Sequence, residues 1–257
     1  MQMQNPLCRV VLDRYAGNLK LSEKLFIIAT GNRLEDKSGA NRISTKLANR
    51  MCVLEFESDI EDWCDWAAKN GMPKTLIQFI RFRPKLLNGF DPKRMINPTP
   101  RSWEMVGRVP VFGDDPTFAL FQQAITGFVG DGAAAEYVGY MKIVNDLPDF
   151  KELLANPETY PVSGKLDIAY ATSMKLIDLL DSEETTKAQV SAIITYIARN
   201  PPEMCAFAYA EINRQSEVRR KVFADPASSR LIDAACRSVF NEEEKTQSAA
   251  PKRKKQA

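Results

Sequence analysis

The chain has 257 residues, of which 44% are hydrophobic and 26% are charged, a composition typical of a globular protein that buries a sizeable core. It contains no histidine, which excludes Ser-His-Asp and Cys-His catalytic arrangements and removes the commonest metal-binding side chain. Subtracting the four positive charges of residues 252–255 from the net charge of +2 leaves −2, so the folded part is not expected to bind nucleic acid through a generic basic surface.

No apolar run reaches the roughly 18–20 residues that a membrane-spanning helix needs, so no membrane association is expected. The first residues, MQMQNPLC, lack the basic and apolar regions of a secretory signal, which predicts a cytoplasmic protein. The cysteines are odd in number, lie in apolar surroundings and form no CxxC pair: Cys8, Cys52, Cys64, Cys205 and Cys236. They are predicted to be buried, reduced thiols, and no metal site is predicted.

The first elements alternate between helix and apolar run. Residues 2–14 are predicted to be the end of a helix; the alternative makes CRVVLD a buried strand that ends in Asp13. The continuous apolar run at 25–29 favours a strand buried on both faces, as in a parallel sheet. A loop at 33–42, a short helix that ends at Arg50 and a second short strand at 51–56 complete the N-terminal part.

The rest of the chain has helical periodicity. One helix is predicted from Ile60 to Gly71 and another after Pro73, while Thr99-Pro100 is a typical N-cap followed by proline for a helix that starts at Arg101. A linker is expected at 110–116. About six helices should follow, most clearly at 184–199 and 227–240, and residues 241–257 are predicted to be disordered.

Three short motifs resemble those of AAA+ ATPases, most closely the MoxR-like, dynein-related branch. They are ATGNR after the first apolar run, LANR about 18 residues later, and PTPRSW at 98–103. The resemblance covers roughly residues 2–110. It implies a mostly α fold with an α/β remnant: part of a P-loop NTPase core (1–57), a helical lid (58–110), an all-α extension (111–240) and a basic tail (241–257).

The resemblance also implies roles for individual residues. Asn32 would be the sensor 1 residue that holds the attacking water, and Arg50 the arginine finger that reaches the γ-phosphate of the neighbouring subunit. Arg101 would be sensor 2, which contacts phosphate in its own subunit from a helix N-terminus. Arg42 is a candidate for a second arginine acting in trans, with a solvated loop cation as the alternative.

Taken singly, each of these residues also has an ordinary structural interpretation. Asn32 would be a turn residue after Gly31, Arg50 a cation at a helix C-terminus, and Arg101 a first-turn arginine. Their order along the chain, on elements of the expected type, is what favours the functional interpretation.

The family binds ATP and Mg²⁺, but neither its GxxxxGK[ST] phosphate loop nor its Walker B strand ending in Asp-Glu occurs in this sequence. The ligands for Mg²⁺ are therefore not in this chain, which is expected to be an N-terminally truncated part of a longer ATPase that forms rings, typically hexamers, and remodels a client protein. The alternative is a catalytically inactive helical module that binds a partner through residues 111–240. A third hypothesis, nucleic-acid binding through the basic tail, is less favoured.

Overall fold

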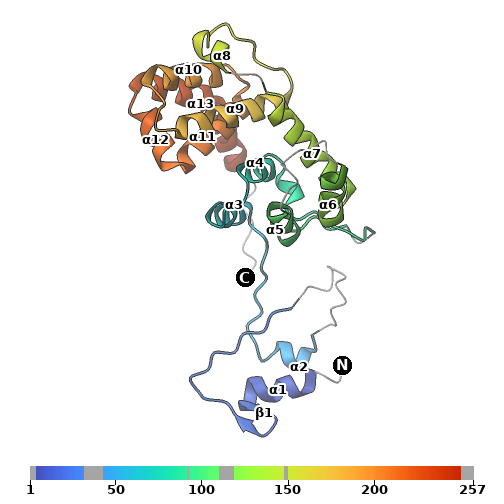
Figure 1. Cartoon of the computed structure of the whole chain (residues 1–257). Coiled ribbons are helices and arrows are strands. Elements are labelled where there is room, and N and C mark those ends of the chain that lie inside the picture. Colours follow the sequence, from blue (N-terminus) through green and yellow to red (C-terminus); the bar gives the residue numbers. More distant parts are fainter. Residues whose placement is uncertain (1–3, 32–42, 92, 110–118, 148–149, 250–257) are drawn as a thin grey trace.

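The computed structural model describes residues 4–31, 43–91, 93–109, 119–147 and 150–249, and within these ranges the side chains from residue 6 to residue 237 (Figure 1). These residues are mostly helical, which confirms the predicted mostly α class. Within the described ranges the one sheet is a small antiparallel hairpin, β1 (Tyr15–Ala16) with β2 (Leu19–Lys20), in which Tyr15 is opposite Lys20.

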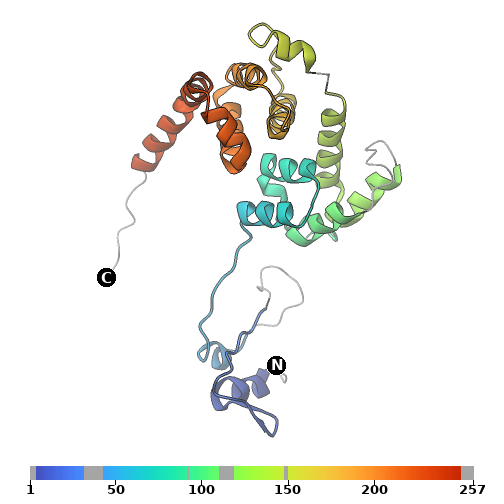
Figure 2. The same ribbon diagram turned by 60° about the vertical axis from the view of Figure 1, so that its left-hand side comes forward.

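The N-terminal segment, residues 4–57, contains α1 (Gln4–Asp13), the hairpin and α2 (Thr45–Ala48). The predicted N-terminal helix is confirmed, and the alternative of a strand ending in Asp13 is wrong. Cys8 of α1 and Leu47 of α2 are buried, and the two helices pack together. In both views this segment lies apart from the other helices, to which residues 51–59 join it as an extended chain (Figures 1 and 2).

The two strands predicted in this segment do not form. Residues 25–29 and 51–56 have no regular secondary structure, and Phe26 and Phe56 are 89% and 90% exposed. A strand of a parallel sheet needs a hydrogen-bonded neighbour, and within the described residues neither segment has one. The prediction that all cysteines are buried is also wrong, because Cys52, in the second of these segments, is exposed.

The remaining helices form one helical body, residues 58–249. Its elements are α3 (Ile60–Lys69), α4 (Lys74–Phe82), the 3₁₀ turn η2 (Pro84–Leu86), α5 (Pro100–Arg108), α6 (Ala119–Val129), α7 (Asp131–Asn145), α8 (Lys151–Ala155), α9 (Leu166–Asp181), α10 (Lys187–Ile197), α11 (Pro202–Arg214), α12 (Ser216–Phe223) and α13 (Pro226–Ala249).

Local sequence signals explain where several of these helices start and stop. The Asp59 side chain accepts a hydrogen bond from the Asp62 amide at 3.0 Å and caps α3, and Gly71, with φ of +70°, lies just beyond the end of that helix. Thr186 and Gln189 form a capping box at the start of α10. Helix α13 continues to Ala249, beyond the predicted end at residue 240, whereas the predicted linker at 110–116 lies outside the described residues.

A single hydrophobic core runs through the helical body. It extends from Trp63 in α3 to Cys236 in α13 and includes residues from both sides of the predicted boundary at 110. Helix α4 lies at its centre: Phe79 contacts the rings of Trp103, Tyr137 and Tyr140. The part predicted to be a lid and the part predicted to be an extension therefore share one core.

Candidate functional site

Two of the four predicted site residues, Asn32 and Arg42, lie outside the described residues. The described chain reaches Gly31, which follows the irregular apolar segment, and resumes at Ile43.

Helix α2 ends at Ala48 with Asn49 as its C-cap, two residues before the predicted end at Arg50, so Arg50 lies just beyond the helix. Ser44 caps this helix by accepting a hydrogen bond from the Leu47 amide at 3.3 Å. The Arg50 side chain is half-buried and its Nη1 donates to the carbonyl oxygen of Lys46, while its Nε is buried with no partner among the described residues. Arg50 therefore does cap the helix C-terminus, as the ordinary interpretation requires, and it retains a nitrogen without an acceptor.

Arg101 is the second residue of α5 and its side chain is exposed. Within the described residues, Arg101 has no hydrogen-bond or ion-pair partner. The helix begins with a capping box, in which Thr99 Oγ1 accepts from the Ser102 amide at 3.1 Å and Ser102 Oγ accepts from the Thr99 amide at 2.8 Å. A guanidinium on the first turn of a capped helix stands beside the positive end of the helix dipole, which suits an anionic ligand.

Two indole groups fix the start of α5. Trp63 Nε1 donates to the carbonyl oxygen of Pro100 at 3.2 Å, and Trp103 Nε1 donates to that of Leu86 at 2.6 Å. Both tryptophans are buried. The backbone that carries Arg101 is therefore held against α3 and η2.

The structure does not bring Arg50 and Arg101 together. Arg50 lies in the N-terminal segment and Arg101 in the helical body, with the extended residues 51–59 between these two parts (Figure 1). A finger that acts on a neighbouring subunit and a sensor that acts within its own subunit need not meet in one chain.

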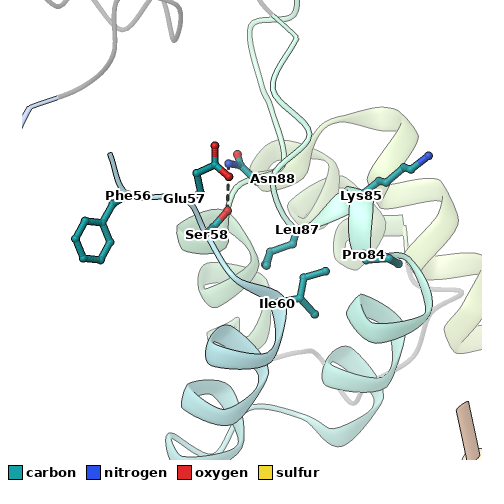
Figure 3. Close-up of a pocket in the computed structure, with 8 residues that line it drawn as sticks. All are labelled: Phe56, Glu57, Ser58, Ile60, Pro84, Lys85, Leu87 and Asn88. Atoms are coloured by element: carbon teal, nitrogen blue, oxygen red, sulfur yellow. Dashed lines mark hydrogen bonds between the residues drawn. The ribbon is translucent and has the colours of Figure 1, made fainter. Parts of the chain in front are cut away.

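A cavity of about 340 Å³ lies where the extended segment enters α3 (Figure 3). Asn88 Nδ2 donates to Ser58 Oγ across it at 3.3 Å, Ile60 and Leu87 form an apolar floor, and the Phe56 side chain points away. No local sequence pattern predicts this cavity, because its lining comes from residues 56–60 and 84–88, which are more than twenty positions apart.

A second cavity, of about 460 Å³, lies between the loop before α5 and the start of α7. Arg94, Met95 and Ile96 line one side and Gly130 to Gly132 the other. Gly130 has φ of +82°, and a Cβ there would approach the carbonyl oxygen of Ile96 to 3.0 Å. Gly130 separates α6 from α7, and glycine is required there for the close approach.

Nucleophilic and metal-binding groups are scarce in the described chain. Burial raises the pKa of Cys64 and Cys205 to about 11, so these thiols stay protonated at neutral pH. Among the described residues, no three cysteine, aspartate or glutamate side chains are grouped so as to hold a metal ion. In the same part of the chain, no helix combines the length and apolar character that crossing a membrane requires.

Comparison of the chain with protein-family models, with curated proteins and with solved structures gives no match. The AAA+ interpretation therefore depends on the three motifs and on the positions of the residues in them.

Proposed function

We propose that this chain is part of an ATP-hydrolysing AAA+ ATPase of the MoxR-like type, which assembles into a ring and remodels a client protein. The remainder of the nucleotide-binding core, including the phosphate loop and the Mg²⁺ ligands, would come from polypeptide outside these 257 residues.

The observation that carries the proposal is the environment of Arg101. An exposed arginine on a helix first turn, with no acceptor among the described residues, is poised for an anion that approaches from outside the helical body. Buried tryptophans hold the backbone beneath it, so the guanidinium is presented from a fixed base. A guanidinium fork matches phosphate oxygens better than a lysine would.

The exposed apolar residues of the N-terminal segment support the same proposal. Phe26, Ile28, Val53, Leu54 and Phe56 are all more than half exposed, on two segments without backbone partners in the described chain. A folded protein rarely leaves such runs in water, whereas a parallel sheet would bury both. The rest of a P-loop core would supply that sheet.

The roles of the chain's own residues follow from this arrangement. ATP with its Mg²⁺ would supply the transferable phosphoryl group, and Arg101 would bind a phosphate oxygen in its own subunit. Arg50 would reach the γ-phosphate of a neighbouring subunit, where its positive charge would stabilise the charge that develops on the phosphoryl oxygens. Asn32 would orient the attacking water.

The test is ATP turnover by a protein that joins this chain to its phosphate loop. We expect Arg50→Ala to lower kcat by about 10³-fold or more while nucleotide binding is retained. Arg101→Ala should weaken both turnover and nucleotide binding. Arg108→Ala is the matched control, because Arg108 is an exposed arginine of the same helix that pairs with Glu104 at 2.9 Å. Turnover that survives loss of Arg50 and Arg101 would overturn the assignment.

A further inference from the structure

One face of α4 carries three polar residues, although this helix lies at the centre of a hydrophobic core. Lys74, Gln78 and Arg81 follow the spacing i, i+4, i+7, which places them on one side of the helix, while Leu76, Phe79 and Ile80 pack into the core. Each of the three polar residues reaches a carboxylate beyond the predicted boundary at residue 110.

The contacts connect α4 to α9 and α11. Lys74 Nζ lies 3.8 Å from Asp178 and 3.4 Å from Asp181, both on α9. Gln78 Nε2 donates to Asp178 Oδ2 at 3.1 Å. Arg81 Nη1 donates to both carboxylate oxygens of Glu211 on α11, at 3.0 and 2.7 Å.

The Arg81–Glu211 pair is almost completely buried, with side chains 12% and 8% exposed. Glu211 also accepts from Gln215 Nε2 at 3.0 Å and pairs with Arg214 at 3.5 Å, and Arg214 in turn pairs with Glu61 on α3. A shift of α11 along α4 would separate Arg81 from Glu211 and leave Arg81 with Glu61, at 3.9 Å, and Glu211 with the partners on its own helix. Loss of the closest contact of a buried ion pair is unfavourable, so the network favours one register between these helices.

We propose that the helices of the predicted lid and those of the extension form one rigid arm, locked by the polar face of α4. In the proposed ATPase, a movement of the lid during nucleotide turnover would then carry α10, α12 and α13 with it, so the extension acts as a lever. The lever movement depends on the proposed function, whereas the rigid joint between the two groups of helices does not.

The joint is tested by electron–electron double resonance on the full chain without nucleotide. Nitroxide labels are attached through Asp65→Cys on α3 and Arg219→Cys on α12, both exposed positions. Cys52→Ser removes the exposed thiol, and the other cysteines are buried. We expect one narrow distance peak; two peaks or a broad distribution would overturn the proposal.

Arg81→Met tests whether the network holds the joint. This change removes the link from α4 to α11 and leaves Glu211 with Arg214 and Gln215, so the chain should still fold. We expect the distance distribution to broaden. Arg83→Met is the matched control, because Arg83 ends the same helix but pairs with Glu136 at the surface, and it should leave the peak narrow. A folded Arg81→Met variant with an unchanged narrow peak would show that the network does not lock the joint.

The two proposals fail separately. If the distance peak is narrow but the longer protein does not hydrolyse ATP, the rigid arm is supported and the proposed ATPase is contradicted. If the distance distribution is broad but the longer protein hydrolyses ATP, the rigid arm is contradicted and the ATPase is supported.

Discussion

At the scale of single residues, burial keeps several thiols of the helical body protonated. It raises the pKa of Cys64 and Cys205 to about 11 and that of Cys236 to about 12. The thiolate is the reactive form, so these three should be inert at pH 8, whereas Cys52 is exposed. In a thiol titration of the native chain we expect one fast-reacting cysteine, which Cys52→Ser removes. Fast reaction at two or more sites would contradict the burial described here.

The same thiols give stability a definite pH dependence. Their folded-state pKa values are raised, so above pH about 9 the unfolded chain loses protons that the native chain retains. The free energy of unfolding should therefore fall as the pH rises through this range, as urea titrations at pH 8 and pH 10 would measure.

The Arg81–Glu211 pair is the charged contact whose loss should cost most. Replacing Arg81 by methionine leaves a buried carboxylate with weaker partners, and we expect the free energy of unfolding to drop by about 3 kcal/mol. Arg83→Met breaks an exposed pair and should change it by less than about 1 kcal/mol. Equal effects of the two changes in urea denaturation would show that Arg81 is not specially placed.

Sequence patterns predict some single residues and miss others for a physical reason. Thr99, Pro100 and Arg101 were assigned correctly to a helix start because capping is local and its signal lies within four residues. The Arg81–Glu211 pair joins residues 130 positions apart. No local pattern distinguishes that arginine from Arg83, since only packing decides which of the two is buried.

At the scale of elements, α4 and α5 pack closely at Gly107. A Cβ at this position would lie 2.6 Å from Met72 Sδ and 3.0 Å from Leu76 Cδ2. Gly107→Ala should therefore lower the free energy of unfolding by about 1–3 kcal/mol through overpacking. At Gly139, in the interior of α7, nothing lies within 4 Å of an added Cβ, and alanine should raise it by about 0.5–1 kcal/mol. Urea denaturation of the two variants tests whether the changes in the free energy of unfolding have opposite signs. Destabilisation by both substitutions would contradict this prediction.

Helices were predicted well and strands were not, because the two depend on different contacts. The hydrogen bonds of α3, α5 and α10 are internal, so periodicity and caps suffice to indicate them. The apolar runs at 25–29 and 51–56 have strand composition, but a strand exists only when another strand pairs with it. The composition of these runs indicates a preference for the strand conformation, but it does not show whether a partner strand is present.

At the scale of the whole molecule, the described chain has a well-packed helical body and an N-terminal segment with much exposed apolar surface. The resemblance to AAA+ ATPases implied a boundary at residue 110, where a linker was also expected, yet one core continues across it. Local breaks mark where helices end and carry no information on which helices share a core. The predicted roles of Asn32 and Arg42 stay predictions, since both lie outside the described residues.

The absence of a phosphate loop from this sequence leads to a prediction about ATP hydrolysis. The sequence carries Arg50 and Arg101 but no GxxxxGK[ST] to bind the β- and γ-phosphates. We therefore expect the purified 257-residue chain to show no magnesium-dependent phosphate release from ATP above background. Measurable turnover, abolished by chelation of Mg²⁺, would mean that the phosphates are bound by groups other than those proposed.

The most direct measurement is the DNA sequence upstream of the codon for Met1, read in frame. We predict that it encodes a GxxxxGK[ST] loop, followed by an apolar strand that ends in Asp-Glu. The longer protein would then provide the sheet that residues 25–29 and 51–56 lack and the phosphates that Arg50 and Arg101 would contact. An in-frame stop codon with no such motifs before it would contradict the proposal that this chain is part of an ATPase.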